Sequence, residues 1–150
     1  HFENSFSYVQ SIQANQPDSM RYLPFTPAPK LHSELRANAK KIGKHLANAY
    51  VKVGIDNYFK QNHFYEAFGT ETATSGYTLL NAGIGTDIVA KNRTLFSIYI
   101  SANNLTNKAY QSHLSRLKYL EENNATGRMG VFNMGRNFSF KLIVPIDIKK

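Results

Sequence analysis

A long alternating stretch, from Gly135 to Ile148, most limits what this chain can fold into. Its apolar parity consists of Phe138, Phe140, Leu142, Val144, Ile146 and Ile148. Its other parity is mostly polar, with Asn137, Ser139, Lys141 and Asp147. Successive side chains of a strand point to opposite faces, so the stretch predicts one apolar and one polar face. The apolar side would run for roughly 20 Å, which suits a tilted strand that crosses a bilayer better than a soluble strand of ~5–6 residues.

Five earlier segments repeat this alternation, and in each the second face is polar or carries small residues. They are residues 2–14, 31–39, 50–59, 77–88 and 95–102. A period of two throughout predicts antiparallel strands with one wet face, so we expect an all-β chain, an up-and-down meander of about six strands. Gly83 and Gly85 share one parity, and we expect them to relieve crowding on an inner face or to form a bulge.

The connections between these segments alternate between long and short. The long ones are residues 15–29, 61–76 and 103–134, and the short ones are 42–47 and 89–93. Membrane barrels of bacteria have short periplasmic turns and long external loops, which predicts this segregation. Six strands are too few to close such a barrel, which needs about eight or more. The chain is thus predicted to be a slice of a larger barrel, and a self-contained soluble sheet of six strands is the alternative.

The amino-acid composition limits the classes of protein to which the chain can belong. The 150 residues suffice for one domain, and nine Tyr and ten Phe suit β structure or the aromatic girdles of a membrane barrel. No apolar run is long enough for a transmembrane helix, and the chain begins with neither Met nor a signal-peptide pattern, so we expect a processed piece. The absence of Cys excludes disulfides and thiolate chemistry. A net charge of +8 suits phosphate-rich partners, nucleic acid or anionic lipid, or simply a solvated surface.

Two motifs near the end of the chain resemble a known family. Residues 97–110 end a predicted strand in Asn104-Leu105 and continue through a polar step to Tyr110, and residues 111–118 look like the next part of the same loop. This order resembles the penultimate-strand signature of TonB-dependent outer-membrane receptors. The sequence Gly135-Arg136-Asn137-Phe138 resembles the Gly-Arg-Asn-aromatic motif that opens the final strand of that family.

Other parts of the chain agree with the family in one place and depart from it in two. Residues 23–30 are similar to the Pro-rich step before an earlier strand. Met134 stands where the family usually has Pro, and the chain ends Ile148-Lys149-Lys150, whereas many outer-membrane barrels end on an aromatic residue.

The resemblance implies a fold and a function. The family has a 22-stranded barrel with an N-terminal plug, and it imports ferric siderophores, haem, cobalamin or glycans. TonB relays the energy to a box near the N-terminus. Residues 1–150 would then be the C-terminal part of the barrel domain, without plug or TonB box, in the outer membrane of a Gram-negative bacterium. The implied partners are outer-membrane lipid, the TonB complex through the missing N-terminal region and a small nutrient ligand, while an isolated fragment is expected to self-associate.

In this barrel, loop length assigns the direction of each strand, and the alternation of side chains assigns the two faces of the last strand. We expect the apolar parity from Phe138 to Ile146 to face lipid and the polar parity from Asn137 to Asp147 to face the lumen. Gly135 and Arg136 are expected to lock the last strand in place, with ligand contact as the alternative, and Asn103 and Asn104 are expected to cap and stabilise a turn.

Candidate ligand-binding residues lie in the long loops. They are His63, Tyr65, His113, Arg116, Lys118, Tyr119 and Arg128. Cations and aromatic rings in external loops suit an anionic ligand such as an iron chelate, and a solvated loop is the alternative. Residues 110–123 are also predicted to form a helical turn or two, because leucines recur there every third residue.

Other chemistries find little support in the sequence. The five histidines show no spacing typical of metal ligands, no catalytic constellation or cofactor motif is visible, and we expect no enzyme. The competing hypothesis is a soluble, basic all-β binding module for nucleic acid or another anion. The aromatic residues lie mostly on the apolar parity, away from Lys and Arg, which argues against nucleic acid.

Overall fold

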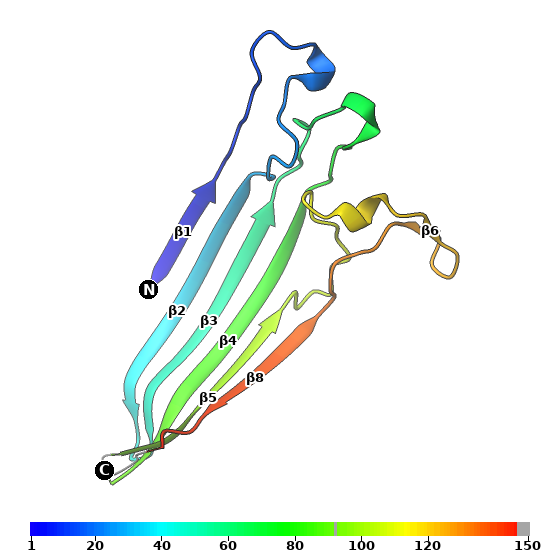
Figure 1. The fold of residues 1–150 in the computed structure, drawn as a ribbon. Coiled ribbons are helices and arrows are strands. Elements are labelled where there is room, and N and C mark those ends of the chain that lie inside the picture. Colours follow the sequence, from blue (N-terminus) through cyan, green and yellow to red (C-terminus); the bar gives the residue numbers. More distant parts are fainter. Residues whose placement is uncertain (92, 147–150) are drawn as a thin grey trace.

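The computed structural model describes residues 1–91 and 93–146, and its main feature is an antiparallel sheet of six strands (Figure 1). The strands are β1 (Phe2–Ser7), β2 (Lys30–Ile42), β3 (Leu46–Tyr58), β4 (Tyr77–Ala90), β5 (Arg93–Asn103) and β8 (Asn137–Ile143). Their order in the sheet follows their order in the sequence, so the predicted meander is confirmed. The sheet is open, with β1 at one edge and β8 at the other.

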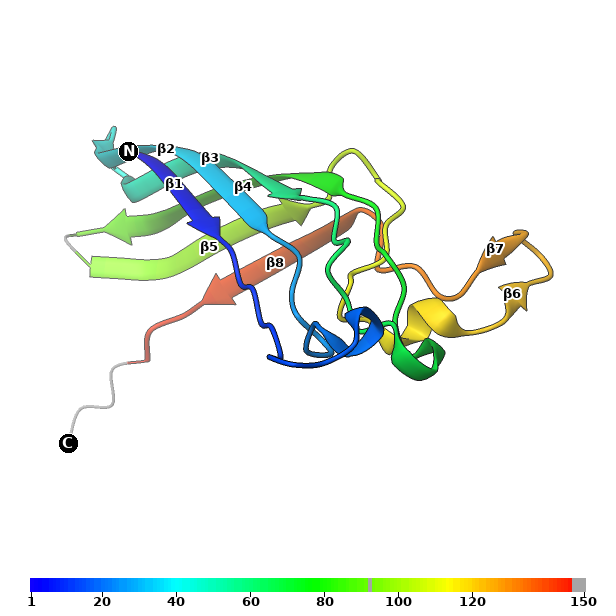
Figure 2. The same ribbon diagram turned by 90° about the horizontal axis from the view of Figure 1, so that it is seen from above.

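All long connections leave one end of the sheet, and the short turns lie at the other end (Figure 1). The long connections contain three short 3-10 helices, η1 (Asp18–Met20), η2 (Ala67–Gly69) and η3 (Arg116–Tyr119), and a small hairpin of β6 (Glu122–Asn123) and β7 (Arg128–Met129). Helix η3 confirms the helical turn predicted within residues 110–123. Figure 2 shows the three helices close together beneath the curved sheet.

The first strand is shorter than predicted. The alternation suggested a strand over residues 2–14, but β1 ends at Ser7, opposite Lys30, where β2 begins. Beyond that point the chain has no sheet neighbour and pairs with itself instead, through an isolated bridge between Ile12 and Tyr22 and a hydrogen bond from Gln13 N to Arg21 O (2.8 Å).

The last strand also ends early. The prediction extended it to Ile148, but β8 ends at Ile143, opposite Ser97 of β5. Pro145 follows, and it has no N–H to donate to a ladder, which accounts for the end of the strand. Val144 and Ile146 are exposed but lie outside the strand, while Asp147 and Ile148 fall outside the described residues.

The registers place the apolar parity of every strand on one face, which we call the apolar face. Ile84 lies opposite both Val51 and Ile100, and Ile100 lies opposite Phe140. Across the six strands this face carries Phe2, Phe6, Leu31, Leu35, Val51, Val53, Ile55, Leu80, Ile84, Ile98, Ile100, Phe138, Phe140 and Leu142. The predicted separation of the strands into an apolar and a polar side is therefore confirmed.

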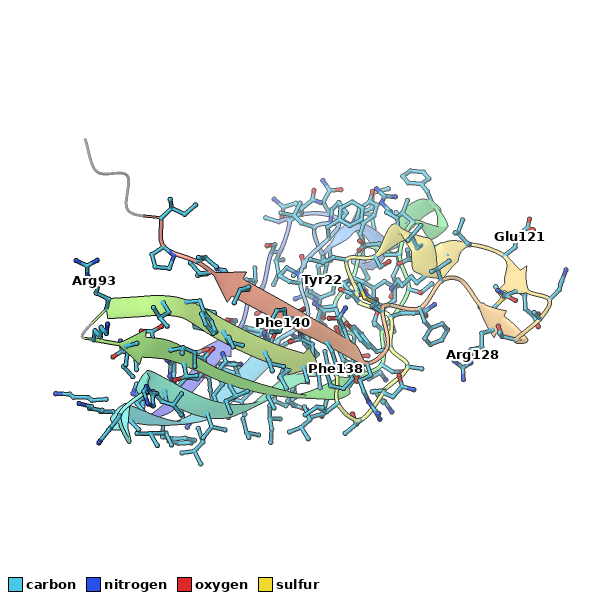
Figure 3. All side chains as sticks on the ribbon, turned by 90° about the horizontal axis from the view of Figure 1, so that it is seen from below. Tyr22, Arg93, Glu121, Arg128, Phe138 and Phe140 are labelled. Carbon is cyan, nitrogen blue, oxygen red and sulfur yellow. The ribbon has the colours of Figure 1, made fainter. Side chains whose placement is uncertain are left out.

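The apolar face is the more exposed of the two. Leu35, Phe138 and Phe140 expose 63%, 67% and 66% of their surface, and Figure 3 shows both phenylalanines on β8. On the opposite face, which we call the polar face, the Asp56 side chain is only 15% exposed. Within the described residues only Ala67, Tyr77 and Ala102 are buried hydrophobic residues, so the sheet has no apolar core of its own. The described helices include none that is long and apolar enough to cross a membrane.

Candidate functional site

The polar face carries a network of charges around Asp56. Lys30 Nζ lies 2.7 Å and His32 Nδ1 2.8 Å from Asp56 Oδ1, while Asn81 Nδ2 donates to Asp56 Oδ2 (2.8 Å). These contacts join β2, β3 and β4, because Asp56 lies directly opposite His32 in the ladder. Each carboxylate oxygen is thereby satisfied by donors from neighbouring strands, which stabilises a charge that water reaches only in part.

A second ion pair lies further along the same face. Lys52 Nζ donates to Glu34 Oε2 at 2.8 Å, again between β3 and β2. Two hollows of about 270 Å³ and about 330 Å³ open over this face, and both are lined by Asn81 and Asn103. The first also meets the Lys52–Glu34 pair and the second meets Asp56. The polar face therefore offers ammonium, carboxylate and amide groups to a hydrophilic partner.

Crowding on the polar face explains its glycines. A Cβ atom on Gly85 would lie 2.5 Å from ring carbons of both Tyr50 and Tyr99, and one on Gly83 would lie 3.2 Å from the Lys52 side chain. The predicted relief of crowding is confirmed for these two positions. Side chains that converge in this way are typical of the inner side of a curved sheet.

The two motifs that carry the family resemblance contact each other. Arg136 Nε donates to Leu105 O (2.8 Å), and Arg136 N donates to Asn107 Oδ1 (3.0 Å). Gly135 is needed beside them, because a Cβ there would lie 2.6 Å from the same Asn107 oxygen. The turn after β5 is thus fastened to the start of β8, and a role of these contacts in locking the last strand stays a prediction.

The buried Asn104 side chain stabilises the turn after β5 through hydrogen bonds to the backbone. Asn104 is 3% exposed and adopts a left-handed backbone conformation (φ 51°). Its side chain donates to Lys108 O (2.9 Å) and accepts from Lys108 N (2.8 Å), while its backbone N donates to Asn81 Oδ1 (3.0 Å). Asn tolerates the left-handed region and replaces missing backbone partners, which is why this residue type suits the position.

Tyr110, the last residue of that motif, ends a stack of three rings. Its centroid lies 4.5 Å from that of Tyr77, which lies 4.6 Å from that of Tyr58. Burial and the nearby Tyr58 phenol raise the pKa of Tyr110 above its usual value. The stack lies where β3 and β4 meet the long loops, and it anchors the largest loop to the sheet.

His113 and Lys118 lie buried at the centre of the loops. His113 is 4% exposed, and its Nδ1 shares a hydrogen bond with Thr74 Oγ1 (2.8 Å). Lys118 Nζ donates to the same hydroxyl (2.7 Å) and to Thr72 O (3.1 Å). His113 Nε2 is buried without a hydrogen-bond partner. Burial lowers the pKa of His113, the Lys118 charge lowers it further, and the Glu71 carboxylate opposes both.

Glu71 joins two of the loops, although sequence patterns gave no reason to single it out. It is 3% exposed and accepts hydrogen bonds from Phe25 N (2.8 Å) and Tyr65 N (3.1 Å). Arg116 stacks over the Phe25 ring at 4.2 Å. Loop residues follow no period, so only their contacts identify Glu71 and Thr74 as central. We call Glu71, Thr74, His113 and Lys118 the loop cluster.

The other predicted loop residues lie around or outside this cluster. Tyr119 Oη accepts from Thr72 N (3.2 Å), at the edge of the cluster. His63 stacks on Tyr22 with centroids 4.8 Å apart, beside the first loop. Arg128 lies over Phe132 (5.2 Å) on the β6–β7 hairpin, which projects away from the sheet (Figure 3). The candidate residues therefore do not converge on one ligand site, and several of them hold loops together. Their role in ligand binding stays a prediction.

Neither a metal site nor a known relative identifies the function of these residues. Within the part of the chain that the structure describes, no group of three or more His, Cys, Asp or Glu side chains could hold a metal ion. No protein-family model matches the chain, and no curated protein and no solved structure matches it.

Proposed function

We propose that the chain is the C-terminal part of the β-barrel of a TonB-dependent outer-membrane transporter. Such a transporter imports a scarce nutrient, a ferric siderophore, haem, cobalamin or a glycan, with energy relayed by TonB. In this proposal the chain builds one side of the barrel wall, and it performs no catalysis. The plug and the TonB box would belong to sequence outside residues 1–150.

The observation that carries the proposal is that the apolar face of the sheet is exposed while the polar face is partly buried, the reverse of a soluble protein. Large apolar side chains on all six strands cover the exposed face, while ion pairs occupy the partly buried one. In water an apolar face of this extent is unfavourable at roughly 25 cal/mol for each Å² exposed. Against hydrocarbon the same face is favourable, and the strands satisfy one another's backbone groups as a bilayer requires.

Three further features support a barrel wall over a soluble sheet. The long loops and short turns lie at opposite ends, as in bacterial outer-membrane barrels. Both edge strands, β1 and β8, present an unpaired side to further strands of a closed barrel. The Asn104 turn and the Gly135-Arg136 motif make contact, so the residues of the family resemblance form one structural unit.

The polar face would line the lumen of the barrel. Its Asp56 and Lys52–Glu34 groups would meet the hydrophilic surface of a plug or the passing nutrient, and the hollows at Asn81 and Asn103 leave room for such contacts. The loop cluster would hold the external loops together above it.

Pairs of neighbouring positions on β5 and on β8 provide the sharpest test. Because residues 1–150 contain no Cys, the single variants Ile100→Cys, Ser101→Cys, Phe140→Cys and Lys141→Cys can be made in a Cys-free version of the full-length protein. In lipid vesicles, we expect labels at 100 and 140 to be quenched by brominated acyl chains. We expect positions 101 and 141 to react with a water-soluble maleimide instead.

The soluble alternative predicts a different outcome. A basic binding module would stay monomeric in buffer without detergent, and brominated lipid would quench none of the four labels. That result, or equal quenching at 140 and 141, would contradict the barrel proposal. A soluble protein that shifts single-stranded nucleic acid in a salt-dependent manner would support the alternative.

A further inference from the structure

The exposed charges at the short-turn end of the sheet are all basic among the described residues. They are Lys40 and Lys41 near the end of β2, Lys44 in the β2–β3 turn, Lys91 in the β4–β5 turn and Arg93 at the start of β5. The two turns lie side by side, because Val89 N donates to His45 O (2.8 Å). Figure 3 shows Arg93 pointing outward at this end. The long-loop end, in contrast, carries both signs of charge.

None of these cations has a carboxylate partner among the described residues. The ion pairs found there involve other groups, chiefly Lys30 with Asp56 and Lys52 with Glu34. The nearest acid in the two adjoining strands, Asp87, already accepts hydrogen bonds from Ser97 Oγ (2.6 Å) and Asn48 Nδ2 (2.7 Å). The positive charge of the turns is thus left for an anion from outside.

A hollow of about 350 Å³ lies in the apolar face next to these turns. It is lined mainly by apolar side chains, among them Ala37, Ala39, Ile42, Leu46 and Ile84. Its volume lies within the range of about 300–1,000 Å³ that is usual for ligand pockets. Ile42 ends β2 at the edge of the hollow, two positions before Lys44 of the β2–β3 turn. Lys41 pairs with Ala47, which pairs with Asp87, so Lys41 lies on the polar face instead.

We propose that the hollow and the basic turns together bind an anionic phospholipid. An acyl chain would fill the hollow, and the headgroup phosphate would lie at Lys44 of the β2–β3 turn, with Lys91 and Arg93 of the neighbouring β4–β5 connection adding to the positive potential. This inference rests on the proposed function, since it requires the apolar face to lie in a bilayer. It goes further by naming a lipid class, a position and the leaflet that the short turns reach.

The charge pattern favours an anionic over a zwitterionic headgroup. A zwitterionic headgroup carries its own cation, which the lysines repel, whereas phosphatidylglycerol presents a net negative charge. An anionic surface gains about a factor of five in affinity for each nearby Lys or Arg, and the gain decreases with salt.

Native mass spectrometry of the full-length protein in detergent tests the site. Phosphatidylglycerol and phosphatidylcholine would be titrated separately against the protein and against the variant Lys44→Gln/Lys91→Gln/Arg93→Gln. We expect phosphatidylglycerol to bind more tightly, and the variant to lose about fivefold for each cation that contacts the headgroup. Ala39→Leu should weaken binding of the same lipid without a change in charge, because its side chain enters the hollow.

The matched control carries the same loss of charge at the other end of the sheet. Arg21→Gln/Lys108→Gln/Arg128→Gln should leave phosphatidylglycerol binding unchanged. A detergent-dependent protein that binds both lipids equally would overturn this inference and leave the barrel proposal standing. A protein that is monomeric without detergent and binds neither lipid would overturn both. Tighter binding of a single-stranded oligonucleotide through the same lysines would assign the cations to nucleic acid.

Discussion

At the scale of single residues, the loop cluster is expected to make the long loops sensitive to acid. Burial, the main cause, and the Lys118 charge lower the pKa of His113. Above the ordinary His pKa of about 6.5, the residue is neutral in both the folded and the unfolded chain. Below about pH 6.5, His113 takes up a proton in the unfolded chain, whereas burial and Lys118 disfavour that proton in the folded chain. The free energy of unfolding therefore decreases as the pH is lowered, until His113 is protonated in the folded state as well.

We therefore predict that the loops of the full-length protein open on acidification. Protection of residues 112–118 against hydrogen exchange, taken relative to the intrinsic exchange rate at each pH, should be high near pH 7.5 and lower near pH 5.5. The free energy of opening should change by at most about 1.4 kcal/mol per pH unit. His113→Gln should remove the pH dependence, because it has no titrating group. Protection that responds to pH equally in both proteins would contradict the role of His113.

Asn104 provides a second prediction at this scale. Asn104→Ala removes both side-chain hydrogen bonds to Lys108 and places a residue without a polar side chain at φ 51°. The expected loss is about 2–3 kcal/mol in urea unfolding from vesicles. Asn104→Gly relieves the backbone but not the lost bonds, so it should fall between Ala and the wild type. A neutral Asn104→Ala would show that the turn does not depend on this cap.

At the scale of elements, β8 distinguishes the two faces of a single strand. Leu142 lies on the apolar face opposite Ile98, and Lys141 lies on the polar face opposite Tyr99. Leu142→Arg should cost about 2–4 kcal/mol if the position lies near the bilayer midplane, because a cation there must leave water. Lys141→Arg is the matched control and should be close to neutral. Equal stabilities of the two variants would place β8 outside the hydrocarbon layer.

At the scale of the whole molecule, the open sheet predicts the behaviour of the isolated chain. Residues 1–150 alone have two unpaired edges and a bare apolar face, so they should associate in buffer without detergent. Analytical ultracentrifugation should show a broad mixture of oligomers, and detergent should disperse it. A single monomeric species in plain buffer would mean that water tolerates this face, and would contradict the membrane interpretation.

The sequence by itself indicated the six strands of the main sheet and their two faces, because alternation with a period of two is a local property of the chain. It also located the Asn104 and Gly135-Arg136 motifs, whose residue types suit turns. The ends of β1 and β8 could not be predicted in this way. β1 ends at Ser7 because the neighbouring strand β2 begins opposite it, at Lys30, and β8 ends at Ile143 because Pro145 follows.

Only the tertiary structure decided which loop residues meet. The contacts of His113 and Lys118 with Thr74, and of Glu71 with Phe25, join residues far apart in sequence, and loops have no period that would reveal them. The same holds for the hollow beside the basic turns, which several strands build together. Local patterns fix the element and its faces, whereas sites depend on distances between elements that no local pattern encodes.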